Sequence, residues 1–215
     1  LYSMDGDAID LPRLVELKRR WDAWLMIDEA HSIGVLGETG RGIAEFHGID
    51  ASEIDILIGT LSKTFVSMGG FVCARAHVVD WLKYTLPGFV FSVGLSPVIV
   101  ETARAALAIL RREPERVARL RRVSRHFLDT AHAAGFSTGD AIGVGIVPVI
   151  FDRPETTLVA SRALTEAGIY APPIMQSGVD PGASRIRFFL TADLDEGLSH
   201  RAIAVLKAVV GSGSV

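Results

Sequence analysis

The chain has 215 residues, of which 49% are hydrophobic and 22% are charged, and its formal net charge is −3. This composition is typical of a globular protein with a buried core. The slightly negative net charge excludes an overall positive potential that would attract nucleic acid. One cysteine, Cys73, excludes an internal disulfide framework and favours a reducing compartment. No hydrophobic run approaches the roughly 18 residues that span a bilayer, so we expect a cytoplasmic protein without a transmembrane segment.

Short strands and helices are predicted to alternate along the first half of the chain. Asp10 can cap a helix that has Pro12 in its first turn and runs to about Trp21. The hydrophobic run after this helix predicts a buried strand, and the four glycines of segment 34–42 predict a loop. The strands of this half are expected at 23–27, 54–59 and 69–74, and a second helix at 76–84.

Pro87-Gly88 is expected to interrupt the regular secondary structure before the second half begins. Helices are expected at 97–112, 114–135, 155–167 and 195–210, and strands at 145–151 and 185–190. Alternating strands and helices predict an α/β architecture for the first part. The second part is predicted to be a smaller α+β unit after a long connecting helix.

The first predicted strand runs into Asp28-Glu29-Ala30-His31, the tetrapeptide that names a class of nucleic-acid helicases. Such an ATPase also needs a phosphate-binding loop of the form G-x-x-x-x-G-K-[ST]. The nearest candidate, Gly59 to Thr64, lacks the glycine before the lysine and lies after the tetrapeptide instead of before it. Basic residues interleaved with aromatic ones are also missing from the sequence. We therefore reject the helicase interpretation and expect no nucleic-acid partner.

Lys63 follows a predicted strand and is flanked by hydroxyl residues. An amine that forms a Schiff base must lose its charge, and partial burial lowers its pKa. Thr60 and Ser62 can donate to a phosphate of the same ligand. Asp28, as a buried carboxylate at a strand end, needs a partner, which a pyridinium nitrogen supplies, and His31 can reach the same ring. An ordinary surface lysine, a helix cap and a loop histidine are the alternatives for these residues taken singly, but the combination predicts a site for pyridoxal phosphate.

The order of these motifs resembles the α-oxoamine synthase family of fold-type I enzymes that depend on pyridoxal phosphate. The matching segments are Ser3–Asp7, Asp28–Gly34, Gly40–Gly42, Gly59–Lys63, Gly69–Gly70, Phe91–Pro97 and Arg185–Ala192. The resemblance covers essentially the whole chain. It implies the C-terminal part of the large, cofactor-binding α/β domain at 1–105 and a small α+β C-terminal domain at 106–215. Enzymes of this family are considerably longer, so we expect the chain to be a piece of a longer polypeptide.

The resemblance assigns catalytic and cofactor-binding roles to individual side chains. It implies that Lys63 carries the cofactor as a Schiff base and that Asp28 pairs with the pyridine nitrogen. It further implies that His31 contacts the ring hydroxyl with help from Ser3. The residues implied for the phosphate are Thr60 and Ser62. No metal is implied.

Two further roles concern the dimer partner and the substrate. Ser92 lies where the partner subunit of a homodimer completes the phosphate site in this family, although the next position, Val93, departs from the usual serine or threonine. Arg187 matches the arginine that binds the amino-acid carboxylate, and Arg185 is the second candidate. Both arginines would face the same side of an alternating strand.

The activity implied by the resemblance is a decarboxylative condensation at the interface of a homodimer. A small amino acid (serine, glycine or alanine) would react with an acyl thioester, carried by CoA or by an acyl carrier protein, to give an α-aminoketone. Three alternatives stay open: another fold-type I enzyme such as an aminotransferase, a catalytically silent partner subunit, and a non-catalytic fragment. The presence of Lys63 argues against the silent subunit, because such subunits lose this lysine.

Overall fold

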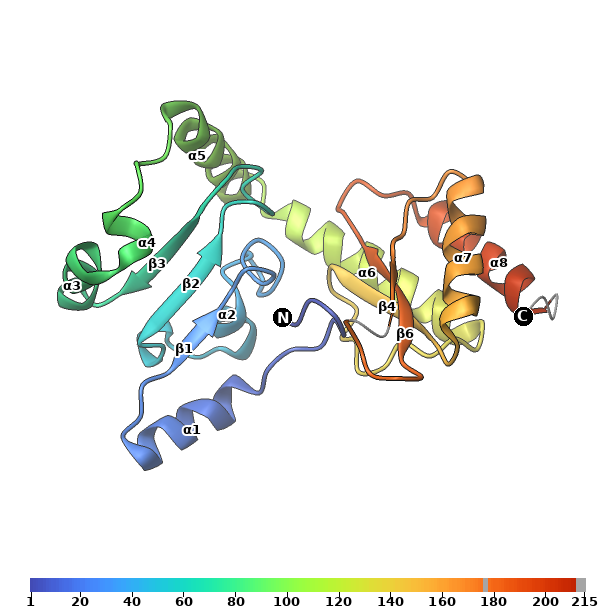
Figure 1. The fold of residues 1–215 in the computed structure, drawn as a ribbon, viewed down its shortest axis with the longest axis horizontal. Helices are drawn as coiled ribbons and strands as arrows, with labels where there is room; N and C mark the ends of the chain where they lie inside the picture. Colours follow the sequence, from blue (N-terminus) through green and yellow to red (C-terminus); the bar gives the residue numbers. More distant parts are fainter. Residues whose placement is uncertain (176–177, 212–215) are drawn as a thin grey trace. The chain divides into compact units, whose positions relative to one another are not determined.

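The computed structural model describes residues 1–175 and 178–211 of the chain (Figure 1). The chain forms two compact units, of which unit 1 contains residues 1 and 9–117, and unit 2 contains residues 2–8 and 118–215. Domains at 1–105 and 106–215 stay a prediction. None of the described helices combines the length and the hydrophobicity that a membrane-spanning segment requires.

Unit 1 is built on a three-stranded sheet with the strand order β1-β2-β3 (Figure 1). β1 runs parallel to β2, with Asp28 opposite Ile58, and β2 runs antiparallel to β3. The elements are α1 (Leu11–Trp21), β1 (Met26–Asp28), α2 (Ile43–His47), the 3-10 helix η1 (Ala51–Glu53), β2 (Ile56–Thr60), β3 (Gly70–Ala74), α3 (Ala76–Thr85), α4 (Pro87–Val90) and α5 (Pro97–Arg112).

Asp55 fixes the starts of β1 and β2 against α1. Its Oδ2 atom lies 2.8 Å from Nζ of Lys18 in α1 and accepts a 2.8 Å hydrogen bond from the backbone N–H of Leu25. Burial alone would raise the pKa of Asp55, but the hydrogen bonds from Lys18 and Leu25 hold it below its usual value. At its other end, α1 is capped as predicted, because Oδ1 of Asp10 accepts from the N–H of Arg13 at 3.0 Å.

The prediction of a buried strand at 23–27 was wrong in position and in burial. β1 covers Met26–Asp28, and within it only Ile27 is buried. Met26 and Trp24 are 61% and 62% exposed. β1 pairs only with β2 among the described strands, and side chains alternate along a strand. Ile27 therefore faces the core, whereas Met26 and Asp28 face the opposite side.

The remaining elements of the sequence prediction agree with the structure to within two residues at each end. One exception is the break expected at Pro87-Gly88, where Pro87 instead begins the short helix α4. Proline suits the first helical position because no partner is needed there for a backbone N–H. The other elements that were missed are too short to show a periodic pattern: α2, η1 and β5.

Unit 2 is a separate antiparallel sheet with the order β4-β6-β5, packed with helices. Leu164 and Leu206, from its two C-terminal helices, are fully buried. This arrangement matches the α+β unit predicted from the sequence. The elements of this part are α6 (Glu115–Ala133), which begins in unit 1, and then β4 (Ile146–Phe151), α7 (Pro154–Glu166), β5 (Pro173–Ile174), β6 (Ser184–Phe189) and α8 (Glu196–Gly211).

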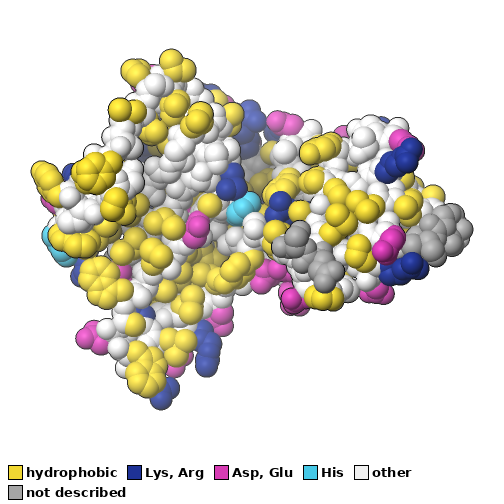
Figure 2. Space-filling view, viewed as in Figure 1, with side chains coloured by type: hydrophobic (Ala, Val, Ile, Leu, Met, Phe, Trp, Pro, Cys, Tyr) yellow, Lys and Arg dark blue, Asp and Glu magenta, His cyan; other side chains and the backbone are white. Residues whose placement is uncertain are grey.

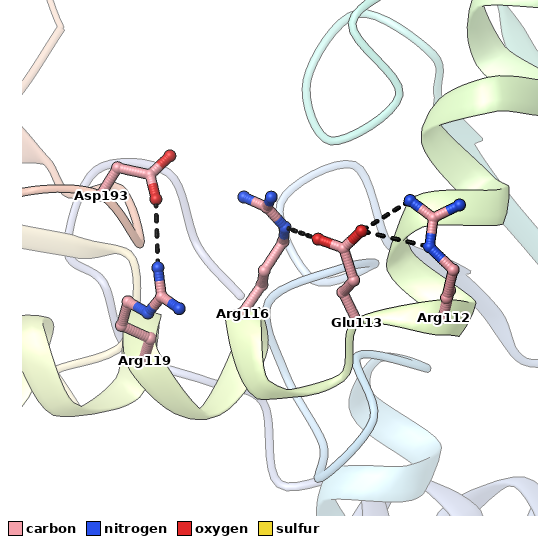
Figure 3. A network of polar contacts seen from close by, with 5 residues as sticks. All are labelled: Arg112, Glu113, Arg116, Arg119 and Asp193. Atoms are coloured by element: carbon pink, nitrogen blue, oxygen red, sulfur yellow. Dashed lines mark hydrogen bonds and ion pairs between the residues drawn. The ribbon is translucent and has the colours of Figure 1, made fainter.

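Glu113 stands at the junction between α5 and α6 (Figure 3). Its carboxylate accepts a hydrogen bond from Nη2 of Arg112 at 2.6 Å and another from Nε of Arg116 at 2.7 Å. These two bonds, the first of them the stronger influence, lower the pKa of Glu113. One acid thus bridges two exposed basic side chains at this junction.

Candidate active site

Two residues predicted from the sequence lie at or just after the carboxyl ends of adjacent strands of the unit 1 sheet, namely Asp28 and Lys63. Asp28 is the last residue of β1, and Lys63 stands three positions after the end of β2 at Thr60. The ladder of the two parallel strands continues beyond Asp28, because the N–H of Glu29 donates to the carbonyl of Ile58 at 2.8 Å. The carboxyl ends of the two strands therefore lie at the same edge of the sheet, which is where open α/β sheets bind their ligands.

Asp28 is exposed, so the expectation that it is a buried carboxylate was wrong. Its Oδ1 atom accepts a 2.7 Å hydrogen bond from the N–H of Ala30. Its Oδ2 atom has no hydrogen-bond partner among residues 1–175 and 178–211. The local turn thus holds one carboxylate oxygen and leaves the other available to a ligand.

Lys63 lies in a loop that closes on its own backbone. The N–H of Leu61 donates to the backbone carbonyl of Gly69 at 2.9 Å, and the N–H of Val66 donates to the backbone carbonyl of Lys63 at 2.9 Å. Val66 has φ of 50°, a backbone conformation that is strained for a β-branched residue. Lys63 is exposed, which differs from the partial burial expected from the sequence. Its Nζ atom makes no hydrogen bond or ion pair with the residues that the structure describes.

The predicted phosphate-binding hydroxyls lie together at the entrance to this loop. Oγ1 of Thr60 and Oγ of Ser62 are 2.7 Å apart, and Oγ1 of Thr60 also donates to the carbonyl of Gly69 at 3.2 Å. Ser92 lies elsewhere in unit 1, is exposed, and donates to the carbonyl of Phe89 at 3.3 Å. The structure therefore brings Thr60 and Ser62 together, and it leaves Ser92 on an exposed segment.

The buried acid at this edge is Glu29, to which the sequence interpretation assigned no role. Only 1% of Glu29 is exposed, and its two carboxylate oxygens lie 2.9 and 3.2 Å from the N–H of Ile43, at the start of α2. Burial raises the pKa of Glu29, and hydrogen bonds from Ile43 and Ser32 offset this only in part. Gly42 has φ of 92°, and a Cβ atom there would lie 2.6 Å from the carboxylate oxygens of Glu29. The carboxylate of Glu29 thus connects the turn that contains the half-buried His31 to the start of α2, and Gly42 leaves room for this contact.

Ser3 and Arg187, which belong to unit 2, contact each other there. Nη1 of Arg187 donates to the backbone carbonyl of Ser3 at 2.8 Å, and its Cζ atom lies 4.5 Å from the ring centre of Phe189. Nε of Arg187 is buried and has no hydrogen-bond partner within the described ranges. Burial lowers the pKa of Arg187. Its guanidinium therefore keeps an unused donor.

Arg185, the second candidate for the substrate carboxylate, is already occupied. It is 6% exposed and forms an ion pair with Asp5. Its guanidinium also donates to the carbonyls of Met4 and Ala183, at 3.1 Å each. Arg185 and Arg187 both contact the segment at residues 3–5, as the alternation of side chains along β6 requires. Of the two arginines, Arg187 is the one that has a buried donor without a partner among the described residues.

Comparison with known proteins places this geometry in a family. Residues 1–206 match the family model of aminotransferases of class I and II. The chain belongs to the aminotransferase class I and II family. It is 40% identical to an 8-amino-7-oxononanoate synthase of Geobacter sulfurreducens over 97% of the chain and 54% of the relative. It is 32% identical to a serine palmitoyltransferase of Bacteroides ovatus over 96% of the chain and 52% of the relative. It therefore spans about half the length of these curated relatives.

Solved structures confirm the predicted fold class. A structure described as SPT with PLP internal aldimine superimposes with a TM-score of 0.92 at 26% identity, and it covers 100% of this chain and 54% of the solved one. The α/β fold of the fold-type I transferases is thus confirmed. The roles of the individual site residues of this family member stay predictions.

Substituting Glu29 with glutamine is expected to change how stability depends on pH. Since the pKa of Glu29 is raised in the folded state, its stabilising contribution is complete below the usual glutamate pKa and is lost as pH rises through the raised value. The unfolding free energy of the wild type relative to Glu29→Gln should therefore fall over this interval, by about 1.4 kcal/mol per unit of pKa elevation. Urea denaturation of the full-length protein between about pH 4 and pH 7 measures this difference.

Glu45 provides a matched control with the opposite sign. Burial would raise its pKa, but hydrogen bonds from Thr39 and Arg41 hold it below the usual value. The wild type should therefore gain stability relative to Glu45→Gln as pH rises through the usual glutamate range. Parallel pH profiles for the two variants would contradict the electrostatic assignment of Glu29.

Proposed function

We propose that the full-length protein is a pyridoxal phosphate-dependent acyltransferase of the α-oxoamine synthase type. Its reaction would be the decarboxylative condensation of serine, glycine or alanine with an acyl thioester of CoA or acyl carrier protein, giving an α-aminoketone. The names of the relatives support this class, since they include 8-amino-7-oxononanoate synthases and serine palmitoyltransferases. One observation carries the proposal: the amine of Lys63 has no partner among the described residues, and Lys63 follows the strand next to that of Asp28.

The residues of unit 1 suit pyridoxal phosphate. Nζ of Lys63 would hold the aldehyde carbon of the cofactor, and the open Oδ2 of Asp28 would accept from the protonated ring nitrogen. The hydroxyls of Thr60 and Ser62, which bond to each other and to Gly69 in this structure, would turn to donate to the phosphate, and His31 would contact the ring hydroxyl. When bound, the cofactor supplies an electron sink for the negative charge that develops on Cα of the amino acid.

Lys63 has a second task after the amino acid has taken its place. Its Nζ, which makes no ion pair with a described residue, would remove the proton from Cα and return a proton after CO2 has left. Asp28 would keep the ring nitrogen protonated and stabilise its positive charge. Proton transfer by Lys63 and charge stabilisation by Asp28 both require that the two side chains face the same ligand.

We also propose roles for Ser3 and Arg187, which contact each other within unit 2. The guanidinium of Arg187 would bind the carboxylate of the amino acid, and its unused Nε donor supports this role. Ser3 would assist His31 at the ring hydroxyl. The Phe189 ring below the guanidinium restricts the directions in which its donors point.

A homodimer is proposed as the active form, with Ser92 completing the phosphate site of the partner subunit. Hydrophobic side chains are exposed over the part of unit 1 that holds α3 and α4 (Figure 2). Contiguous exposed hydrophobic surface marks protein interaction sites. The large exposed hydrophobic side chains from residue 81 to residue 93 are Trp81, Tyr84, Leu86, Phe89, Val90, Phe91 and Val93.

We propose the cytoplasm as the compartment, since the free Cys73 is exposed and an exposed free thiol suits a reducing compartment.

Borohydride treatment of the full-length protein with pyridoxal phosphate should attach the cofactor to Lys63. The reason is that reduction converts the reversible bond to the amine into a permanent one, which peptide mass spectrometry locates. Lys63→Ala should lose this modification. Lys83→Ala, which removes an exposed lysine paired with Asp80, should retain it. Modification of the Lys63→Ala protein to the wild-type extent would contradict the assignment.

The product distinguishes the proposed reaction from that of an aminotransferase. With a small amino acid and an acyl thioester, the full-length protein should release CO2 and free thiol in equal amounts. An aminotransferase would instead convert a 2-oxo acid to an amino acid, without CO2. If neither CO2 release nor amino transfer were detected while the cofactor is fixed on Lys63, the proposed reaction would be contradicted.

A further inference from the structure

Thr64, the neighbour of Lys63, makes a hydrogen bond to a different loop of unit 1. Its Oγ1 atom donates to the backbone carbonyl of Ile33 at 2.8 Å. Thr64 and Ile33 are both half-buried. The bond therefore joins the loop after β2 to the turn after β1, across 31 positions of sequence.

The backbone of Gly34 receives the Thr64 side chain. Gly34 has φ of 80°, and a Cβ atom built on it would collide with Cγ2 of Thr64 and lie 2.6 Å from its Oγ1. The threonine thus fills the space that a side chain at position 34 would need. The contact has both a polar part, the hydroxyl, and a packed part, the methyl group.

Ile33 is firmly connected to the residues of the candidate site. The N–H groups of Ser32 and Ile33 donate to the carbonyl of Glu29 at 3.0 and 3.1 Å. Glu29 follows Asp28 directly, and His31 lies within the same turn. A shift of Ile33 would therefore move the turn that carries His31 and that begins at Asp28.

We propose that Thr64 is a positioning residue that fixes the Lys63 loop relative to the Asp28–His31 turn. The strand pairing of β1 with β2 ends at Glu29, and beyond that point the Thr64 hydroxyl links the two segments directly. Catalytic groups need to be held within fractions of an ångström of their productive geometry. The consequence for the cofactor rests on the proposed function, whereas the link itself can be tested without it.

Two substitutions separate the hydroxyl from the shape of the side chain. Thr64→Val keeps the branched shape and removes the donor, which leaves the Ile33 carbonyl without its partner. Thr64→Ser keeps the donor and removes the methyl group. Thr130→Val is the matched control, because Oγ1 of Thr130 is also part-buried and donates to a backbone carbonyl, that of His126, at 2.7 Å.

The first measurement is amide hydrogen exchange of the cofactor-free, full-length protein. Thr64→Val should accelerate exchange of the amides at residues 32–36 by roughly threefold or more, since local opening then costs one hydrogen bond less. Thr64→Ser and Thr130→Val should match the wild type in this segment. Unchanged exchange in Thr64→Val, or equal acceleration in Thr64→Ser, would overturn the proposal.

The second measurement is the affinity for pyridoxal phosphate, followed by its absorbance. Thr64→Val should bind about tenfold more weakly than the wild type, and Thr64→Ser should restore the affinity. Equal weakening in Thr130→Val would show a general stability effect and would overturn the positioning role. A wild type that binds no cofactor would remove the proposed function, while the exchange data would still decide whether Thr64 links the two segments.

Discussion

The parallel pairing of β1 with β2 is the constraint on which the candidate site depends. It sets Asp28 opposite Ile58 and ends both strands at one edge of the sheet. A shift of one residue in this register would move Asp28 to the face now occupied by Ile27, because side chains alternate along a strand. The acid and the lysine of the proposed cofactor site thus owe their common location to backbone hydrogen bonds, and the side chains add the chemistry.

Beyond the ends of the strands, hydrogen bonds of side chains connect the loops in place of backbone pairing between strands. The carboxylate of Glu29 holds the start of α2 through Ile43, and the hydroxyl of Thr64 holds Ile33. Both contacts meet a glycine at positive φ, Gly42 and Gly34, where a side chain would collide. Gly34 and Gly42 therefore allow close approach by neighbouring polar side chains, which gives a physical reason for glycine at these two positions after the acid.

The sequence predicted the longer elements, their order and a division into two parts, because strand ends and helix caps have local signatures. The roles that it assigns to Lys63 and Asp28 stay predictions. The sequence could not predict that Glu29 is buried and Asp28 exposed. That difference depends on which side of a three-residue strand packs on the core, and a strand so short has no readable alternation. Thr64 was missed for a related reason, since its partner lies 31 positions away and a single threonine in a loop carries no periodic signal.

The central claim is that Asp28 and Lys63 hold one pyridoxal phosphate between adjacent strands. Its most direct test is the nitrogen NMR chemical shift of the cofactor ring, labelled at its pyridine nitrogen and bound to the full-length protein. The wild type should show a protonated ring nitrogen at neutral pH, and Asp28→Asn should bind the cofactor with that nitrogen unprotonated, because the carboxylate that stabilises the charge is gone. The same protonated signal in both proteins would contradict the account.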